Sequence, residues 1–100
     1  MIVKAWGQSY RVKMAVDRYV TNKNLALPMW CEDGPFATLT VNLDEKLPGN
    51  QAYVDVNNCP WAEDLIRQYE IGKPLGRVRP SGWCVYPLYE FDLDRIKEVS

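Results

Sequence analysis

The pattern that decides the fold lies in residues 52–69, which read AYVDVNNCPWAEDLIRQY. From Ala52 to Val56 every second residue is apolar, as in a strand with one buried face. From Trp61 to Tyr69 the apolar residues recur at intervals of three and four positions, which is typical of an amphipathic helix. We expect this helix over about residues 59–71. The change of period from two to about 3.6 predicts an α+β protein.

Strand-like alternation also runs through most of the remaining chain. Its clearest case is Phe36–Leu43, and a final strand is expected from Trp83 to about Phe91. The other expected strands are residues 2–6, 10–16 and 25–31. A short C-terminal helix is expected over Leu93–Val99. The whole predicts an antiparallel meander sheet of about five or six strands with one main helix packed on a face.

Glycine and proline mark where these elements end. Gly72 is expected just past the end of the main helix, and Asn58 or Cys59 at its N-cap. Residues 72–82, GKPLGRVRPSG, are expected to form a loop. Pro28 cannot donate to a strand ladder, so the strand that contains it is expected at a sheet edge or broken.

Length and composition favour one globular domain over residues 1–100. The 100 residues are 47% hydrophobic and 25% charged, which argues against disorder. Two separate cores would each be too small. The start of the chain has no basic segment followed by a long apolar stretch, so we expect no signal peptide and no membrane span. Three cysteines, an odd number, favour the cytoplasm.

The sequence contains no histidine. Its absence excludes Ser-His-Asp and Cys-His catalysis and histidine metal ligands. The net charge of −1 conceals blocks of opposite sign: residues 1–30 carry +4, residues 31–64 carry −6, residues 65–87 carry +3 and residues 88–100 carry −2. A polarised surface is therefore compatible with a nearly neutral chain.

The expected loop 72–82 is the best candidate binding site. Lys73, Arg77 and Arg79 are suited to contact phosphates, and Trp83 is suited to stack on a base or on a partner side chain. The alternative is a solvated connection whose charges only keep it in solution.

Other aromatic and basic residues extend this candidate site. Trp6, Trp30 and Trp83 cannot all be interior in so small a domain, and an exposed tryptophan is a natural interface anchor. Arg11 lies in a strand where basic and aromatic residues alternate, as in sheets that bind nucleic acid. The alternative is an ordinary exposed sheet face.

Two further groups carry weaker signals. Cys31, Cys59 and Cys84 are candidate metal ligands, although their wide spacing favours three small buried side chains instead. Near a helix start, Cys59 is also a candidate for a lowered pKa and some reactivity, with burial as the favoured alternative. Asp55 is a carboxylate in an expected strand and a candidate for metal-dependent catalysis. No cofactor is expected.

Several segments resemble a known family. They are residues 36–43 (FATLTVNL), 47–49 (LPG), 52–63 (AYVDVNNCPWAE), 72–74 (GKP) and 81–91 (SGWCVYPLYEF). Over about residues 25–95 they resemble a small domain-of-unknown-function family encoded on phages, plasmids and conjugative elements of Firmicutes. The strings NNCPWA and YPLYEF are the most specific. The resemblance implies no catalytic residue.

The resemblance and the lack of a catalytic constellation together favour a binding protein. We expect a non-enzymatic counter-defence inhibitor, of the anti-CRISPR type, that binds a host nuclease as its protein partner. The first alternative is an accessory factor that binds DNA or RNA. The second is a small enzyme that uses a metal held by carboxylates or cysteines.

Overall fold

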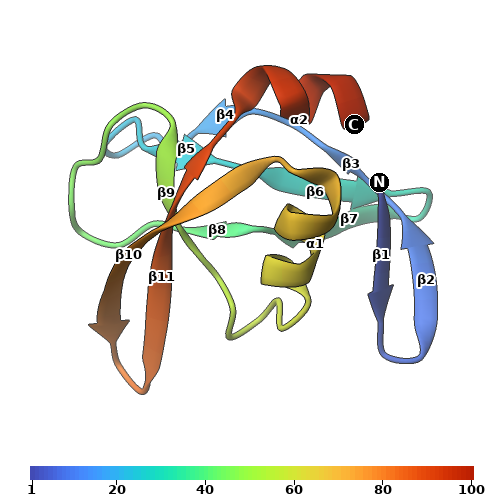
Figure 1. Ribbon diagram of the computed structural model, residues 1–100, viewed down its shortest axis with the longest axis horizontal. Coiled ribbons are helices and arrows are strands. Elements are labelled where there is room, and N and C mark those ends of the chain that lie inside the picture. The colour runs from blue at the N-terminus through green and yellow to red at the C-terminus, as the bar shows by residue number, and fades with distance from the viewer.

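The computed structural model describes residues 1–100 and contains two helices among eleven short strands (Figure 1). The first strands are β1 (Ile2–Ala5), β2 (Gln8–Arg11), β3 (Lys13–Met14), β4 (Asp17–Arg18), β5 (Leu25–Ala26), β6 (Pro28–Cys31), β7 (Gly34–Thr38), β8 (Thr40–Val41) and β9 (Gln51–Val54). They are followed by α1 (Ala62–Tyr69), β10 (Gly72–Ser81), β11 (Cys84–Phe91) and α2 (Leu93–Val99). The expected α+β class and the short C-terminal helix are confirmed.

The strands do not form the single meander sheet that the alternation suggested. They divide among four antiparallel sheets: β10-β11-β9-β8, β3-β6-β7, and the pairs β1-β2 and β4-β5. The side-chain pattern could not reveal this division, because alternation fixes which face of a strand is buried and leaves its partner open.

The expected strand Phe36–Leu43 shows how one strand is shared between two sheets. It is divided at Leu39, between β7 and β8. Leu39 donates its N–H to the carbonyl of Leu27 over 3.0 Å and accepts the N–H of Asp55 over 2.9 Å. The chain therefore passes from the β3-β6-β7 sheet to the four-stranded sheet at this buried residue.

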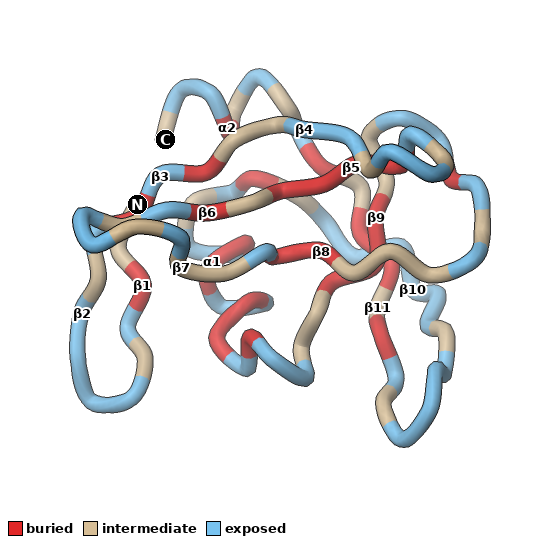
Figure 2. Tube along the Cα trace, turned by 180° about the vertical axis from the view of Figure 1, so that it is seen from behind, coloured by how far each residue is buried: buried red, intermediate tan, exposed pale blue.

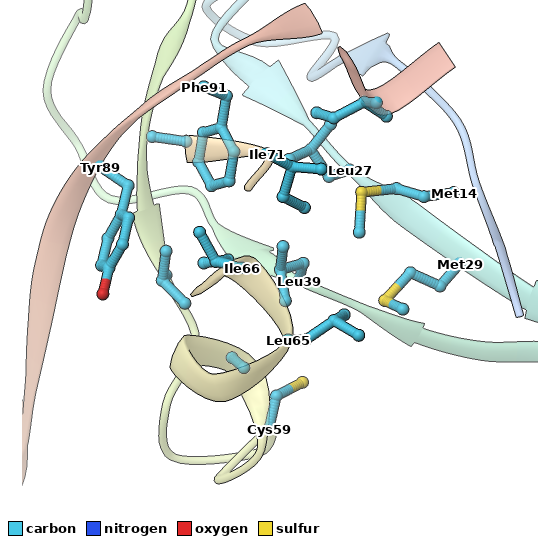
Figure 3. Close-up of a cluster of buried hydrophobic side chains, with 14 of the residues drawn as sticks. Met14, Leu27, Met29, Leu39, Cys59, Leu65, Ile66, Ile71, Tyr89 and Phe91 are labelled. Atoms are coloured by element: carbon cyan, nitrogen blue, oxygen red, sulfur yellow. The ribbon is translucent and has the colours of Figure 1, made fainter. Parts of the chain in front are cut away.

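The main core extends between the two helices and draws on both larger sheets (Figure 3). Figure 3 shows Leu65 and Ile66 of α1 pointing toward Leu27, Met29 and Leu39. Ile96 of α2, which is fully buried, belongs to the same cluster. A smaller cluster of Leu47, Tyr53, Tyr86 and Leu88 lies on the other face of β9 and β11. Packing of α1 and α2 against these strands joins residues from Val3 to Ile96 in one hydrophobic core.

Helix α1 is shorter than the expected 59–71, and neither expected cap is used. Its N-cap is Trp61, with no side-chain cap hydrogen bond. At the other end Glu70, with φ of 54° in the left-handed region, takes the place just past the helix that was expected for Gly72. The N–H of Glu70 bonds to Arg67 and that of Ile71 to Ile66, over 3.3 and 3.2 Å, which is a Schellman ending. Neither α1 nor α2 is long and apolar enough to cross a membrane.

Gly72 is required for a different reason, at the start of β10. A Cβ at this position would lie 2.9 Å from the carbonyl oxygen of Glu90 and 3.0 Å from the ring of Phe91. No side chain fits there unless the backbone moves. Glycine therefore lets β10 approach β11 closely.

Candidate functional site

The expected loop 72–82 is a strand. Residues Gly72–Ser81 form β10, which pairs with β11 along its length and lies at the edge of its sheet. The register shifts between Pro74 and Val78, and within this bulge Gly76 has φ of 77°. Pro74 and Pro80 are acceptable in β10 because an edge strand has one side free of ladder bonds. The glycines and prolines thus indicate an edge and a bulge rather than a loop.

The two faces of the β10–β11 hairpin carry different side chains at its far end. Cross-strand partners share a face, and the pairs Arg79–Tyr86 and Ser81–Cys84 alternate with Val78–Pro87 and Pro80–Val85. Tyr86 faces the smaller hydrophobic cluster. The apolar face continues the side of β11 that carries Tyr89 and Phe91 into the main core.

No other part of the chain covers this apolar face beyond the core. Val78 and Val85 are among the few large apolar side chains that the fold leaves exposed, and Pro80 is exposed beside them. Figure 2 shows the hairpin extending away from the body, with the end of β10 and the connecting turn exposed. The hairpin is therefore an arm with an uncovered apolar side.

Trp83 occupies the tip of this arm. The turn between Ser81 and Cys84 consists of Gly82, with φ of 61°, and Trp83. Glycine at the first turn position is the signature of a type II′ hairpin. Trp83 has a relative exposure of 104%, so its indole touches no other part of the chain. The base of the arm is tied to α1, because the Tyr89 hydroxyl donates to the Glu63 carboxylate.

The two arginines of β10 are engaged by one carboxylate. Arg77 Nη2 lies 2.6 Å from Glu45 Oε2, and Arg79 Nη1 lies 3.0 Å from Glu45 Oε1. The Tyr53 hydroxyl donates to Glu45 Oε1 over 3.1 Å. Desolvation works to raise the pKa of Glu45, but the Tyr53 hydrogen bond and the charges of Arg77 and Arg79 hold it below its ordinary value. Much of the positive charge of the expected basic loop is therefore neutralised within the protein.

Asn24, which is buried, holds the segment that presents Glu45. Its Nδ2 donates to the carbonyl of Glu45 over 2.7 Å, and its Oδ1 accepts the N–H of Leu47 over 3.0 Å. A buried amide that bonds two main-chain groups fixes the path of a loop. Asn24 thus positions Glu45 opposite β10.

The other predicted site residues lie in separate places. Lys73 is at the base of the arm, where its Nζ is 3.5 Å from Glu90 Oε1. Arg11 and Trp30 line a hollow of about 450 Å³ together with Lys13. Lys13 and Trp30 are cross-strand partners. The seven predicted residues therefore do not form one site: only Arg77, Arg79 and Trp83 share the outer part of the arm.

Trp6 lies at the tip of the other hairpin, β1–β2. The turn is Trp6-Gly7, with φ of 52° and 74°, both values in the left-handed region that a type I′ turn requires. Trp6 is 68% exposed, and its ring lies 6.1 Å from Tyr10 and 6.2 Å from Phe36. In Figures 1 and 2 both hairpins extend to the same side of the body, one on each side of α1.

The weaker candidates have structural roles. Burial, together with the charge of Asp55, raises the pKa of Cys59 to about 11, so the candidate lowering is wrong. Cys59 lies in the main core, whereas Cys84 packs against the smaller cluster. No three Cys, Asp or Glu side chains are grouped as metal ligands would be. Asp55 follows β9 and accepts hydrogen bonds of 3.2 and 2.9 Å from Asn58.

Reasoning from sequence missed the residues that shape the arm. Val78, Pro80, Val85 and Pro87 alternate with polar residues on both sides of Gly82-Trp83, which is a hairpin pattern. The many glycine and proline residues in this segment favoured a loop instead, and this masked the hairpin pattern. Glu45 and Asn24 offered no comparable signal, because each acts on residues far away in the chain.

Comparison with known proteins assigns the family. No curated protein and no solved structure matches the chain. A family model described as Domain of unknown function (DUF4313) matches residues 13–100, a wider span than the expected 25–95. The matched residues include the whole β10–β11 arm and exclude β1 and β2. The chain therefore belongs to the DUF4313 family.

Proposed function

We propose that this protein acts without catalysis, by stoichiometric binding of a partner protein to the β10–β11 arm. The observation that carries the proposal is the full exposure of Trp83 at the tip of a hairpin whose apolar face is uncovered. Tryptophan is strongly enriched among the residues that dominate binding energy in protein interfaces. The adjoining valines and prolines provide the apolar surroundings that exclude water around such an anchor.

The arm is suited to binding because it is ordered before the partner arrives. The ion pairs of Arg77 and Arg79 with Glu45 and the bond from Tyr89 to Glu63 fix it to the body. A partner therefore has little main-chain entropy to remove, and the cost of ordering does not offset the burial of Trp83.

The charges of the arm favour a protein partner over nucleic acid. Nucleic-acid binding depends on cations that neutralise phosphates. Arg77 and Arg79 share the Glu45 carboxylate, and Lys73 lies beside Glu90 at the base. The outer apolar face carries no charge.

The family resemblance extends the proposal to a context. We place the protein on a mobile genetic element of Firmicutes, where it blocks a CRISPR nuclease in the cytoplasm. Short proteins of such elements that counter host defence typically act by occupying a surface of the nuclease, and an ordered arm with an exposed tryptophan is suited to that task.

The test is a cleavage assay with a panel of purified CRISPR nucleases, each mixed with this protein in increasing ratio. We expect one nuclease to be inhibited at about equimolar protein, and Trp83→Ala to weaken that inhibition at least tenfold. Val20→Ala is the matched control, because Val20 is exposed on the β4–β5 loop away from the arm. Absence of inhibition and of complex formation across the panel overturns the nuclease as partner.

A direct binding measurement separates the two macromolecule classes. Single-stranded and double-stranded DNA and RNA are titrated with the protein at several salt concentrations. Binding that weakens steeply with salt and is lost in the double variant Arg77→Gln, Arg79→Gln supports a nucleic-acid factor instead.

A further inference from the structure

The outer edge of β1 is a second surface with free main-chain groups. β1 pairs only with β2, so its other side has no strand neighbour. Met1 and Val12 exchange hydrogen bonds of 2.9 and 2.8 Å. In an antiparallel pair bonded and non-bonded positions alternate, so Ile2 and Lys4 direct their N–H and C=O groups away from β2.

Helix α1 lies beside this edge. The N–H of Ile2 donates to the Tyr69 hydroxyl, at the last residue of α1, over 2.6 Å. Figures 1 and 2 both show β1, and not β2, as the strand of this hairpin next to α1. The Tyr69 hydroxyl is a partner for only one of the outward main-chain groups, the N–H of Ile2. The carbonyl of Ile2 and both main-chain groups of Lys4 have no partner within the protein.

A groove separates β1 from α1 at this point. It is a hollow of about 160 Å³ lined on one side by Ile2, Val3 and Lys4 and on the other by Trp61, Asp64 and Leu65. Its walls are the strand edge and a helix side on which Trp61 and Leu65 are apolar and Asp64 and Gln68 are polar. Lys4 and Asp64 supply one charge of each sign.

Trp61 supplies an independent sign that an acceptor is missing here. Its indole Nε1 is the one buried side-chain nitrogen or oxygen in the protein without a hydrogen-bond partner. A buried donor without an acceptor is unfavourable, and such groups are rare. Trp61 is one of the residues that line the groove.

We propose that the groove between β1 and α1 binds an extended peptide segment of a partner protein, which adds to β1 as a further strand. Three main-chain hydrogen bonds are available, from the carbonyl of Ile2 and from the N–H and carbonyl of Lys4. One side chain of the peptide is apolar and faces Trp61 and Leu65. Strand addition takes its affinity from main-chain bonds and its specificity from alternate side chains.

The geometry favours a single strand over a second copy of this chain. A symmetric pair would have to join two β1 edges, and each edge is flanked by its own α1. A second copy would bring its β1 with β2 attached, whereas α1 bounds the far side of the groove. The groove admits one extended chain instead.

This site is separate from the arm that carries Trp83. It uses β1, which lies outside residues 13–100, so the inference concerns this chain and not the whole family. It also does not require the proposed function to hold.

The test is a titration of the isotope-labelled full chain, followed by nuclear magnetic resonance. The probes are four capped pentapeptides of the form Thr-Xaa-Thr-Xaa-Thr, with valine, leucine, isoleucine or phenylalanine as Xaa. We expect saturable shifts at the amide of Lys4 and at the indole N–H of Trp61 with at least one peptide, and slower exchange of the Lys4 amide with solvent. Absence of saturable shifts with all four peptides overturns the proposal.

Lys4→Pro is the decisive variant. Proline removes the outward N–H, which β2 does not use, and proline is tolerated in an edge strand at such positions. Binding is expected to weaken at least tenfold. Ser9→Pro is the matched control, because Ser9 is the cross-strand partner of Lys4 and directs its N–H to the opposite edge. An equal loss of peptide binding in both variants contradicts the assignment of the peptide to the outer edge of β1.

Two further measurements distinguish this groove from the arm and a partner peptide from a second copy. The Trp83→Ala variant is expected to bind the peptides as the native chain does. Loss of peptide binding in this variant would overturn the claim that the groove is separate from the arm. In sedimentation of the protein alone, we expect either no dimer or a dimer that the Lys4→Pro variant also forms. Such a dimer would make a second copy the occupant and overturn the partner peptide.

Discussion

Arg79 Nη1 lies 3.0 Å from Glu45 Oε1 and joins β10 to the segment between β8 and β9. Arg77 Nη2 reaches the other oxygen of the same carboxylate. A single carboxylate is thus held by two guanidinium groups from one strand. The contact fixes the arm at its bulge, while the tip beyond it stays free of the body.

Glu45→Gln is expected to destabilise the protein in a pH-dependent way. The pKa of folded Glu45 is below its ordinary value, despite the opposing effect of desolvation, because Tyr53, Arg77 and Arg79 favour the charged form. Its contribution is therefore present above the unfolded pKa of about 4.3 and is lost as the pH falls through the lower folded pKa. Urea unfolding should show a lower midpoint for the variant at about pH 7 and a smaller difference at about pH 2.5.

Glu32→Gln serves as its control. Glu32 is exposed in the turn between β6 and β7 and forms no ion pair. It should leave the midpoint unchanged at both pH values. If Glu45→Gln lowers the urea midpoint equally at both pH values, the shape of the side chain at this position matters and its charge does not.

Asn24→Ala is expected to reduce the free energy of unfolding by about 2 kcal/mol. The change leaves the carbonyl of Glu45 and the buried N–H of Leu47 without their amide partner. Asn57→Ala is the control, since Asn57 is exposed, and should change stability by less than about 0.5 kcal/mol. Urea unfolding of both variants measures the difference, and equal small effects would refute the role of Asn24.

Glu70→Gly is expected to stabilise the protein by about 0.5–1 kcal/mol. Glu70 has φ of 54° at the end of α1, where a residue with a Cβ is strained and glycine is not. Part of the gain is offset by the greater freedom of glycine in the unfolded chain. Glu70→Ala keeps the Cβ and should bring no such gain in thermal or urea unfolding. A similar gain in both variants would trace the effect to the lost charge.

Cys59 is expected to be the slowest cysteine to react with iodoacetamide. Burial and the neighbouring Asp55 raise its pKa to about 11, and the thiolate is the reactive form. Cys31 and Cys84 are partly exposed. Peptide mass spectrometry after labelling at about pH 8 should show these two modified first, and all three at similar rates in urea. Early labelling of Cys59 in the folded protein would contradict its burial.

The predictable part of the fold follows from local pattern. The alternation through Ala52–Val56 and the helical spacing from Trp61 to Tyr69 correctly indicated a strand followed by a helix. The same reasoning failed at residues 72–82, where glycine and proline pointed to a loop. There the pairing with β11 outweighs weak local preferences, because a bulge at Gly76 and an edge position accommodate both residue types.

The candidate site was predictable only in its exposed members. Trp83 could be suggested as an anchor because a small domain cannot bury all its tryptophans. The apolar face beside it depends on the register of β10 against β11, and register is a tertiary property.

By itself, the sequence determined the α+β class, the inward residues of the strand and helix in residues 52–69, and the absence of histidine chemistry. These follow from the side-chain period and composition, which are local. Only the tertiary structure decided that Glu45 pairs with both Arg77 and Arg79, from 32 and 34 positions away, and that the edges of β1 and β10 remain unpaired. Such relationships depend on contacts between distant segments, and these form only when the packed core brings the segments together.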